Sequence, residues 1–328
     1  FAMRHIFYIC IKKMCFSEKS HIIWSVILVG SSIKTRQKVV MVAVKKEGAI
    51  VMGEYFTLII QIFQLPFMIR ALIVGVLISL CASLLGVSLV LKRYSMIGDG
   101  LSHVGFGALA LAAAFNVTPL YVAIPVVILT AFLLLRVNES GKLKGDAAVA
   151  MISASALAIG VLIVSVSETN VDLNSYLFGS IYAISNQDMY LSICLSVAVI
   201  LLYLVFYNKM FAVVFDENFA RATGAKATAY NMVMACLTAV TVVVGMRLVG
   251  SLLISSLIIF PALTSMRICK TFKKVIISSS AVGIVCIVVG IISSFLLDVP
   301  ASACIVLINL TAYIIFTVIG FIKEKYSK

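Results

Sequence analysis

The chain has 328 residues, of which 62% are hydrophobic and 12% are charged, and its formal net charge is +13. Apolar runs of about twenty residues recur along it, and a run of that length crosses the hydrocarbon core of a bilayer as a helix. This pattern excludes a water-soluble globular protein and leaves little chain for a large soluble domain, so we predict an all-α polytopic membrane protein.

Residues 1–51 differ from the rest of the sequence. They carry nine Lys or Arg and two Asp or Glu, a balance of +7, which leaves +6 for residues 52–328. Their longest apolar stretch, HIIWSVILVGSSI, is too short to span a membrane. We expect a non-native basic leader, translated from upstream sequence or disordered, or else a basic arm that contacts anionic lipid. Residues 52–328 then form the transmembrane domain, whose small charge does not indicate a nucleic-acid partner.

Apolar stretches with few charges follow, and most are long enough to cross a bilayer. Basic residues gather in alternate loops between them, which the positive-inside rule places in the cytoplasm together with the C-terminus. The intervening loops contain four acidic residues and almost no Lys or Arg, so they face outward. Two irregular segments leave the count at eight or nine spans. The stretches cover residues 71–91, 101–115, 117–135, 147–167, 189–207, 228–246, 248–266, 275–297 and 299–322.

An aspartate and a histidine stand four residues apart at the start of the second stretch, in the sequence GDGLSHVGFGALALA (98–112). Residues four apart lie on one face of a helix, and ionisable groups in a span usually face an interior path. Asp99 and His103 are therefore a candidate ligand pair for a divalent metal such as Zn²⁺ or Mn²⁺. One helix supplies only two ligands, whereas a two-fold dimer supplies the pair twice. The alternative is an aspartate that caps the helix and a histidine bonded to a neighbour.

The two irregular segments lie further along the chain. SYLFGSIYAISNQD (175–188) is too short to span and too apolar for a free loop, which predicts a short re-entrant or interfacial helix. The apolar run from 242 to 265 is interrupted by Gly245, Arg247 and Gly250, and Pro261 stands near its end. Such breaks are tolerated at membrane depth where protein or water satisfies the backbone, so Arg247, Gly250 and Pro261 are candidates for lining a pathway. An ordinary tight turn between two spans is the alternative.

No enzyme motif competes with a transport function. The sequence has no GxxxxGK[ST] phosphate loop, no GxSxG and no HExxH, and His103 is the only histidine after Met52. We therefore predict a chain that is not an enzyme. If ATP drives its function, another chain binds the nucleotide.

Five blocks in one order resemble the integral-membrane permease of the zinc/manganese-type ABC importers, from about Pro66 to the C-terminus. The resemblance implies a type II-importer-like permease fold. It identifies Asp99 and His103 with the metal-ligand pair of the family's GD-x-x-SH motif, and gives Gly98 and Ser102 packing or supporting roles in that motif. The blocks are MIGDGLSHVGFGALALA, YLFGSIYAIS, VVFDENFARATGAKATAYNM, LTAVTVVVGMRLVGSLLISSLIIFPALTS and LLDVPASACIVLI.

The resemblance also identifies the sequence FARATG with the cytoplasmic segment that docks into the ATPase. We call these residues the docking segment, and they lie on the side that the basic loops place in the cytoplasm. Where many members of the family continue the first motif with LPG, this chain has GFG (105–107), so a proline kink is not expected there. The docking segment consists of Phe219, Ala220, Arg221, Ala222, Thr223 and Gly224.

The implied partners are a second copy of the chain, two cytoplasmic ATP-binding subunits and an extracellular or periplasmic metal-binding protein, at a bacterial plasma membrane. No permanently bound cofactor is expected, and the transported ion is zinc by preference or manganese or iron as alternatives. A metal/proton secondary transporter that works without ATP is the second class, because Asp and His also serve as proton relays. A membrane scaffold or receptor is the third, and it would leave Asp99 and His103 unexplained.

Overall fold

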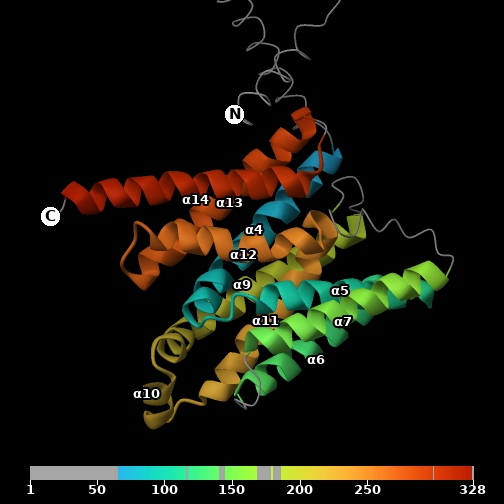
Figure 1. Cartoon of the computed structure of the whole chain (residues 1–328), viewed down its shortest axis with the longest axis horizontal. Helices are drawn as coiled ribbons and strands as arrows, with labels where there is room; N and C mark the ends of the chain where they lie inside the picture. Colours follow the sequence, from blue (N-terminus) through green and yellow to red (C-terminus); the bar gives the residue numbers. More distant parts are fainter. Residues whose placement is uncertain are drawn as a thin grey trace, which may run out of the picture. The chain divides into compact units, whose positions relative to one another are not determined.

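The computed structural model describes residues 66–115, 117–139, 145–167, 179, 186–297 and 299–326, apart from a few side chains. These residues lie in one compact unit, Phe63–Lys328. The predicted leader 1–51 is outside the described residues. The described residues form helices and no strand (Figure 1). The helices are α4 (Pro66–Leu91), α5 (Ile97–Ala114), α6 (Pro119–Glu139), α7 (Gly145–Val166), α9 (Asn186–Phe215), α10 (Glu217–Ala222), α11 (Ala227–Val249), α12 (Ser251–Met266), α13 (Phe272–Leu297) and α14 (Ala301–Tyr326).

Within the described part of the chain, 8 helices are long and apolar enough to cross a membrane, which confirms the all-α polytopic prediction. The predicted span over 248–266 is the exception. It is represented by α12, whose 16 residues cover about 24 Å at 1.5 Å per residue, less than the roughly 30 Å of a hydrocarbon core. The structure therefore favours eight spans and one shorter apolar helix.

Helix α4 is a central helix of the fold, because it contacts four others, α9, α11, α12 and α13. Small residues on α4 make these contacts close: a Cβ added at Gly86 would clash with the carbonyl group of Ile258 in α12. In contrast, α9 and α14 expose most of their apolar side chains. Exposed apolar surface of this kind suits lipid, which is as apolar as the side chains themselves.

Helix α5 packs most extensively against α7 and α6, and Figure 1 shows these helices side by side. Two glycines let the backbones of α5 and α7 approach closely. A Cβ at Gly107 would lie 2.9 Å from the Ala156 carbonyl oxygen, and a Cβ at Gly160 would lie 3.0 Å from the Gly107 Cα atom. The small residues of GDGLSHVGFGALALA therefore bring α5 close to its neighbours, as their type predicts.

The irregular segments differ in how much of them the structure describes. Most of the predicted re-entrant helix over 175–188 lies outside the described residues. The run from 242 to 265 is interrupted at Gly250 alone, which has φ 91° and separates α11 from α12. Gly245 continues α11 and Pro261 lies inside α12, so neither breaks a helix. The physical reason is that only Gly250 adopts a left-handed φ, a conformation that ends a helix.

Candidate functional site

The aspartate and histidine singled out in the sequence lie on one face of α5. Asp99 is in the first turn of the helix, because α5 begins at Ile97, four residues before the predicted stretch. The distance from His103 Nε2 to Asp99 Oδ2 is 3.8 Å, and the side chains are 13% and 39% exposed respectively. His103 Nδ1 is buried and has no hydrogen-bond partner among the described residues. The pair thus approaches without a direct hydrogen bond, and both residues line one space.

That space is a cavity of about 280 Å³ between α5 and α7. Asp99 and His103 line it from α5, while Asp146, Ser153 and several apolar residues line it from α7. Asp146 lies in the first turn of α7 and is exposed. No group of three His, Cys, Asp or Glu residues among the described residues is arranged to hold a metal ion. One chain in this conformation therefore offers a two-residue pair, with a second carboxylate in the same cavity.

Sequence reasoning did not select Asp146. The signal that was available is its position: it opens an apolar stretch directly after a basic loop, as Asp99 does. What the sequence does not show is that α5 and α7 pack together and bring the two helix starts to one cavity.

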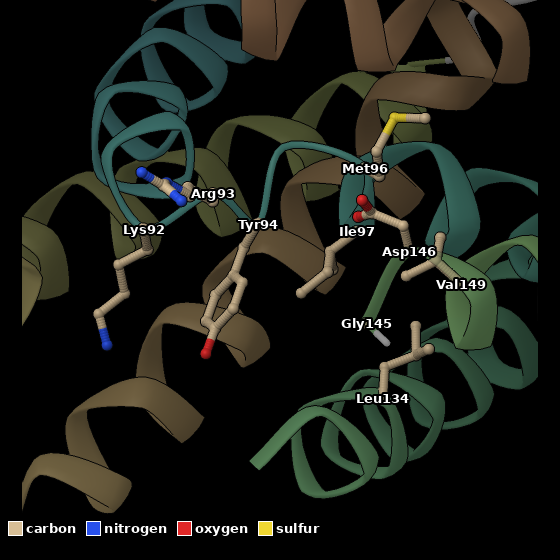
Figure 2. Close-up of a pocket in the computed structure, with 9 residues that line it drawn as sticks. All are labelled: Lys92, Arg93, Tyr94, Met96, Ile97, Leu134, Gly145, Asp146 and Val149. Atoms are coloured by element: carbon tan, nitrogen blue, oxygen red, sulfur yellow. The ribbon is translucent and has the colours of Figure 1, made fainter. Parts of the chain in front are cut away.

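A second cavity, of about 220 Å³, adjoins the first and shares Met96, Asp146 and Val149 with it. Figure 2 shows this cavity, with the residues of the turn between α4 and α5 on one side and Asp146 on the other. Lys92 and Tyr94 extend from that turn in the same direction. Asp146 therefore stands between the Asp99–His103 cavity and a more basic one.

The two small residues of the GD-x-x-SH motif have local structural roles. The Ser102 hydroxyl donates a hydrogen bond to the Asp99 carbonyl oxygen at 2.7 Å, and the Ser102 side chain is fully buried. A Cβ at Gly98 would lie 2.9 Å from Ile258 Cδ1 of α12. Gly98 thus allows α12 to approach, and the Ser102 hydroxyl is hydrogen-bonded to the backbone of Asp99.

The docking segment consists of the last four residues of the short helix α10 and the turn that follows it. Asp216 caps this helix by accepting a hydrogen bond from the Phe219 amide at 2.9 Å. The Phe219 side chain is 65% exposed, Arg221, Ala222, Thr223 and Gly224 are exposed, and Ala220 is buried. Gly224 has φ 82° and ends the segment. A large exposed apolar residue beside an exposed cation is a suitable surface for another protein.

Charged groups connect the docking segment to the rest of the fold. Glu217, at the start of α10, accepts hydrogen bonds from Lys92 Nζ at 3.0 Å, from Arg221 at 2.6 Å and from Asn231 at 3.3 Å. Burial alone would raise the pKa of Glu217, but the hydrogen bonds from Lys92 and Arg221 outweigh it and hold the pKa below its ordinary value.

Two of the three residues predicted to line a pathway lie away from these two cavities. Gly250 and Pro261 are buried in the described fold, and neither lines either cavity. Arg247 belongs to α11, and its side chain lies outside the described part of the structure. Their predicted pathway role stays a prediction.

Comparison with known proteins gives consistent results. A model of the ABC 3 transport family matches residues 64–320. The manganese import system permease protein ScaB of Streptococcus gordonii is 31% identical over 264 residues, which cover 80% of this chain and 94% of that protein. The chelated iron transport system membrane protein YfeD of Yersinia pestis is 26% identical over 272 residues, covering 83% and 92%. The solved structure of PsaBC from Streptococcus pneumoniae in complex with Fab matches with a TM-score of 0.72 at 28% identity, over 79% of this chain and 93% of that one.

Proposed function

This chain belongs to the ABC 3 transport family, and from that premise we propose that it is the permease subunit of an ATP-driven importer of manganese. The observation that carries the proposal is the Asp99–His103 pair, whose side chains approach to 3.8 Å at one cavity on a tightly packed helix. A carboxylate and an imidazole are donors that Mn²⁺, Fe²⁺ and Zn²⁺ all accept.

A second copy of the chain completes the metal site in this proposal. The pair provides two donor residues, whereas a tetrahedral site takes about four and an octahedral site about six. A two-fold axis beside α5 doubles the set to two carboxylates and two imidazoles, and water fills any positions that remain. The transported ion would thus cross at an interface between two copies.

The choice of ion rests on the relatives and on donor chemistry together. ScaB is named for manganese and YfeD for chelated iron. At an equal site, affinity follows the order Mn²⁺ below Fe²⁺ below Zn²⁺, which by itself favours zinc. That order ranks affinities at one site and does not determine which ion the metal-binding protein delivers. Because ScaB is named for manganese, we place manganese first and keep iron and zinc as alternatives.

The route of the ion follows from the two adjoining cavities. An ion delivered from outside by a metal-binding protein would meet Asp99 and His103, and Asp146 would offer it a second carboxylate. Beyond Asp146, the neighbouring cavity is lined by the exposed Arg93, whose charge repels a cation. A release path would then stay on the Asp146 side of the turn. By the positive-inside rule, this end and the C-terminus would face the cytoplasm, with the chain in a bacterial plasma membrane.

In the proposed dimer, one ATP-binding subunit would dock on the segment Phe219 to Gly224 of each copy. Its exposed phenyl ring supplies apolar area and its exposed Arg221 supplies a charge, and such anchors commonly dominate interface energies. The chain itself would supply no nucleotide site, which agrees with the absence of a GxxxxGK[ST] motif from the sequence.

The test is metal accumulation in bacterial cells that lack their own high-affinity uptake. The chain is expressed with its ATP-binding subunit and metal-binding protein, and cell-associated manganese, iron and zinc are measured by mass spectrometry. Asp99→Ala and His103→Ala should each abolish uptake of the transported ion, and Asp146→Asn should reduce it. Ala198→Leu, which changes an exposed residue of α9, is the matched control and should transport normally.

Each outcome separates the candidates. Uptake that persists without the ATP-binding subunit would replace the importer with a secondary carrier or a channel. Full uptake by folded Asp99→Ala and His103→Ala variants would remove the metal site from α5. A preference for zinc or iron would leave the permease assignment standing and correct the ion.

A further inference from the structure

Lys92 is a buried cation at the cytoplasmic end of α4. Its side chain is only 6% exposed, and its ammonium group lies 3.0 Å from Glu217 Oε2. It also donates a hydrogen bond to the amide oxygen of Asn231 in α11, and its ammonium nitrogen lies 5.8 Å from the centre of the Tyr94 ring. A lysine is rarely buried to this degree unless its charge is paired. Glu217 therefore provides the charge that keeps Lys92 inside.

The residues that follow Lys92 form a fixed turn that leads directly into α5. The Tyr94 amide donates to the Leu89 carbonyl oxygen at 2.8 Å, and the Arg93 amide donates to the Val90 carbonyl oxygen at 3.1 Å. This pattern is the Schellman end of a helix, with Arg93 at φ 61° where glycine is usual. The Ile97 amide then donates to the Tyr94 carbonyl oxygen at 3.1 Å, and α5 begins. Movement of Lys92 is thus passed to the first turn of α5, which carries Asp99.

The other member of the pair, Glu217, lies two residues before the docking segment, on the same short helix. Glu217 is the first residue of α10, and its second oxygen accepts from Arg221 within that segment at 2.6 Å. Asn231 donates to Glu217 at 3.3 Å and so ties the start of α11 into the same cluster. One carboxylate therefore joins the surface proposed for the ATPase to the turn before the metal-ligand pair, across 125 residues of sequence.

We propose that the Lys92–Glu217 pair is the mechanical link between ATP-driven movement of the docking segment and the Asp99 end of α5. This rests on the proposed permease function and names two positioning residues for it. Separating the pair leaves a buried ammonium without its counter-charge, which is strongly unfavourable. The two groups consequently move together, so a displacement of α10 displaces the turn at Arg93 and, with it, the helix that holds Asp99 and His103.

The experiment measures transport and hydrolysis separately in the whole transporter. The chain is reconstituted in liposomes with its ATP-binding subunit and its metal-binding protein, and Mn²⁺, Fe²⁺ and Zn²⁺ are offered separately. The readout is metal ions accumulated per ATP hydrolysed. Lys92→Met removes the charge and keeps the chain length. Glu217→Gln keeps the shape, and the double variant Lys92→Met/Glu217→Leu replaces both partners with apolar groups. Lys209→Met, at an exposed position on α9, is the matched control.

Wild type and Lys209→Met should give equal ratios. All three variants of the pair should lower the ratio by at least about fivefold while ATP hydrolysis continues, since couplings between sites usually amount to 5- to 150-fold. The double variant is decisive, because replacing both members of an ion pair commonly preserves stability even where the pair is buried, and here Lys92 is 6% and Glu217 29% exposed. A double variant that is stable and fully coupled, while Lys92→Met is unstable, would reduce the pair to a folding element and overturn the proposal.

Failure of the link and failure of the proposed function give different results. If the double variant does not assemble, Glu217→Gln decides the matter, and an unchanged ratio in that variant overturns the link. If wild type accumulates none of the three ions in an ATP-dependent way, the permease function itself fails. Normal wild-type transport with a normal ratio in the variants rejects only the Lys92–Glu217 link.

Discussion

Replacement of Gly160 by leucine tests whether the α5–α7 contact holds the candidate metal site in shape. A Cβ at position 160 would lie 2.9 Å from Phe106 Cε1 and 3.0 Å from the Gly107 Cα atom. Carbon atoms in comfortable contact are about 3.5 to 4.0 Å apart. The first added atom is therefore too close by about 0.5 to 1 Å, and the rest of the leucine side chain needs further space. Phe106 is 2% exposed and has little room to withdraw.

The expected cost is about 2 kcal/mol. Over-packing of this kind costs about 1 to 3 kcal/mol, here at the upper end because four carbons are added and one obstacle is backbone. Loss of a helix glycine returns up to about 1 kcal/mol. In a chain of 328 residues, about 2 kcal/mol lowers Tm by roughly 3 °C. Because α7 also carries Asp146 and Ser153, its displacement should reduce metal uptake as well.

The assay is thermal unfolding of detergent-solubilised protein followed by size-exclusion chromatography, together with metal accumulation in cells. Ala198→Leu adds a similar side chain on the exposed face of α9 and should leave Tm and uptake close to wild type. A Gly160→Leu protein with wild-type Tm and uptake would refute the reasoning, because it would mean that α5 and α7 have room between them.

Two further predictions concern the surroundings of the site and the docking segment. Ser102→Ala removes the hydrogen bond to the Asp99 carbonyl oxygen, so it should lower stability by about 0.5 to 1.5 kcal/mol in thermal unfolding and leave the choice of metal unchanged; an altered choice of metal would make Ser102 a ligand. The pKa of Glu217 is held below its ordinary value of 4.5, so the stabilisation that its charge provides is complete above that pH and is lost as the pH falls through the lowered pKa. The measurement is hydrogen exchange of α10 in wild type and in Glu217→Gln. The difference in protection between the two proteins should stay constant from about pH 8 to pH 6. A loss of that difference within this range would contradict the assignment.

The sequence predicted the helices well because the bilayer leaves few alternatives. Backbone groups in lipid have to bond internally, so apolar runs of sufficient length become helices. The exception is the run after Gly250, where apolar composition alone suggested a ninth span and α12 has only 16 residues. Length is set there by the left-handed Gly250 and by the turn after Met266, and neither is a matter of hydrophobicity.

The candidate site was predictable only where its residues share a helix. Asp99 and His103 are four residues apart, so the helical period places them together without knowledge of the fold. Asp146 reaches the same cavity only because glycines at 107 and 160 let α5 and α7 approach. The pairing of Lys92 with Glu217 joins residues separated by 125 positions, and no periodicity encodes such a contact.

The packing of α5 restricts how the candidate site can change during transport. Along the membrane-embedded part of the helix, Gly107 lies against the backbone of α7 with no room for a methyl group. A dense contact of this kind does not deform gradually, because its atoms are already close-packed. Helices α5 and α7 should therefore move as one body that carries Asp99, His103 and Asp146 together. The polar contacts at the turn between α4 and α5 can pass a push from α10 to that body, since Lys92 meets Glu217 just before α5 begins. A site on such a body changes the side to which it opens more readily than it changes its own geometry, as alternating access requires.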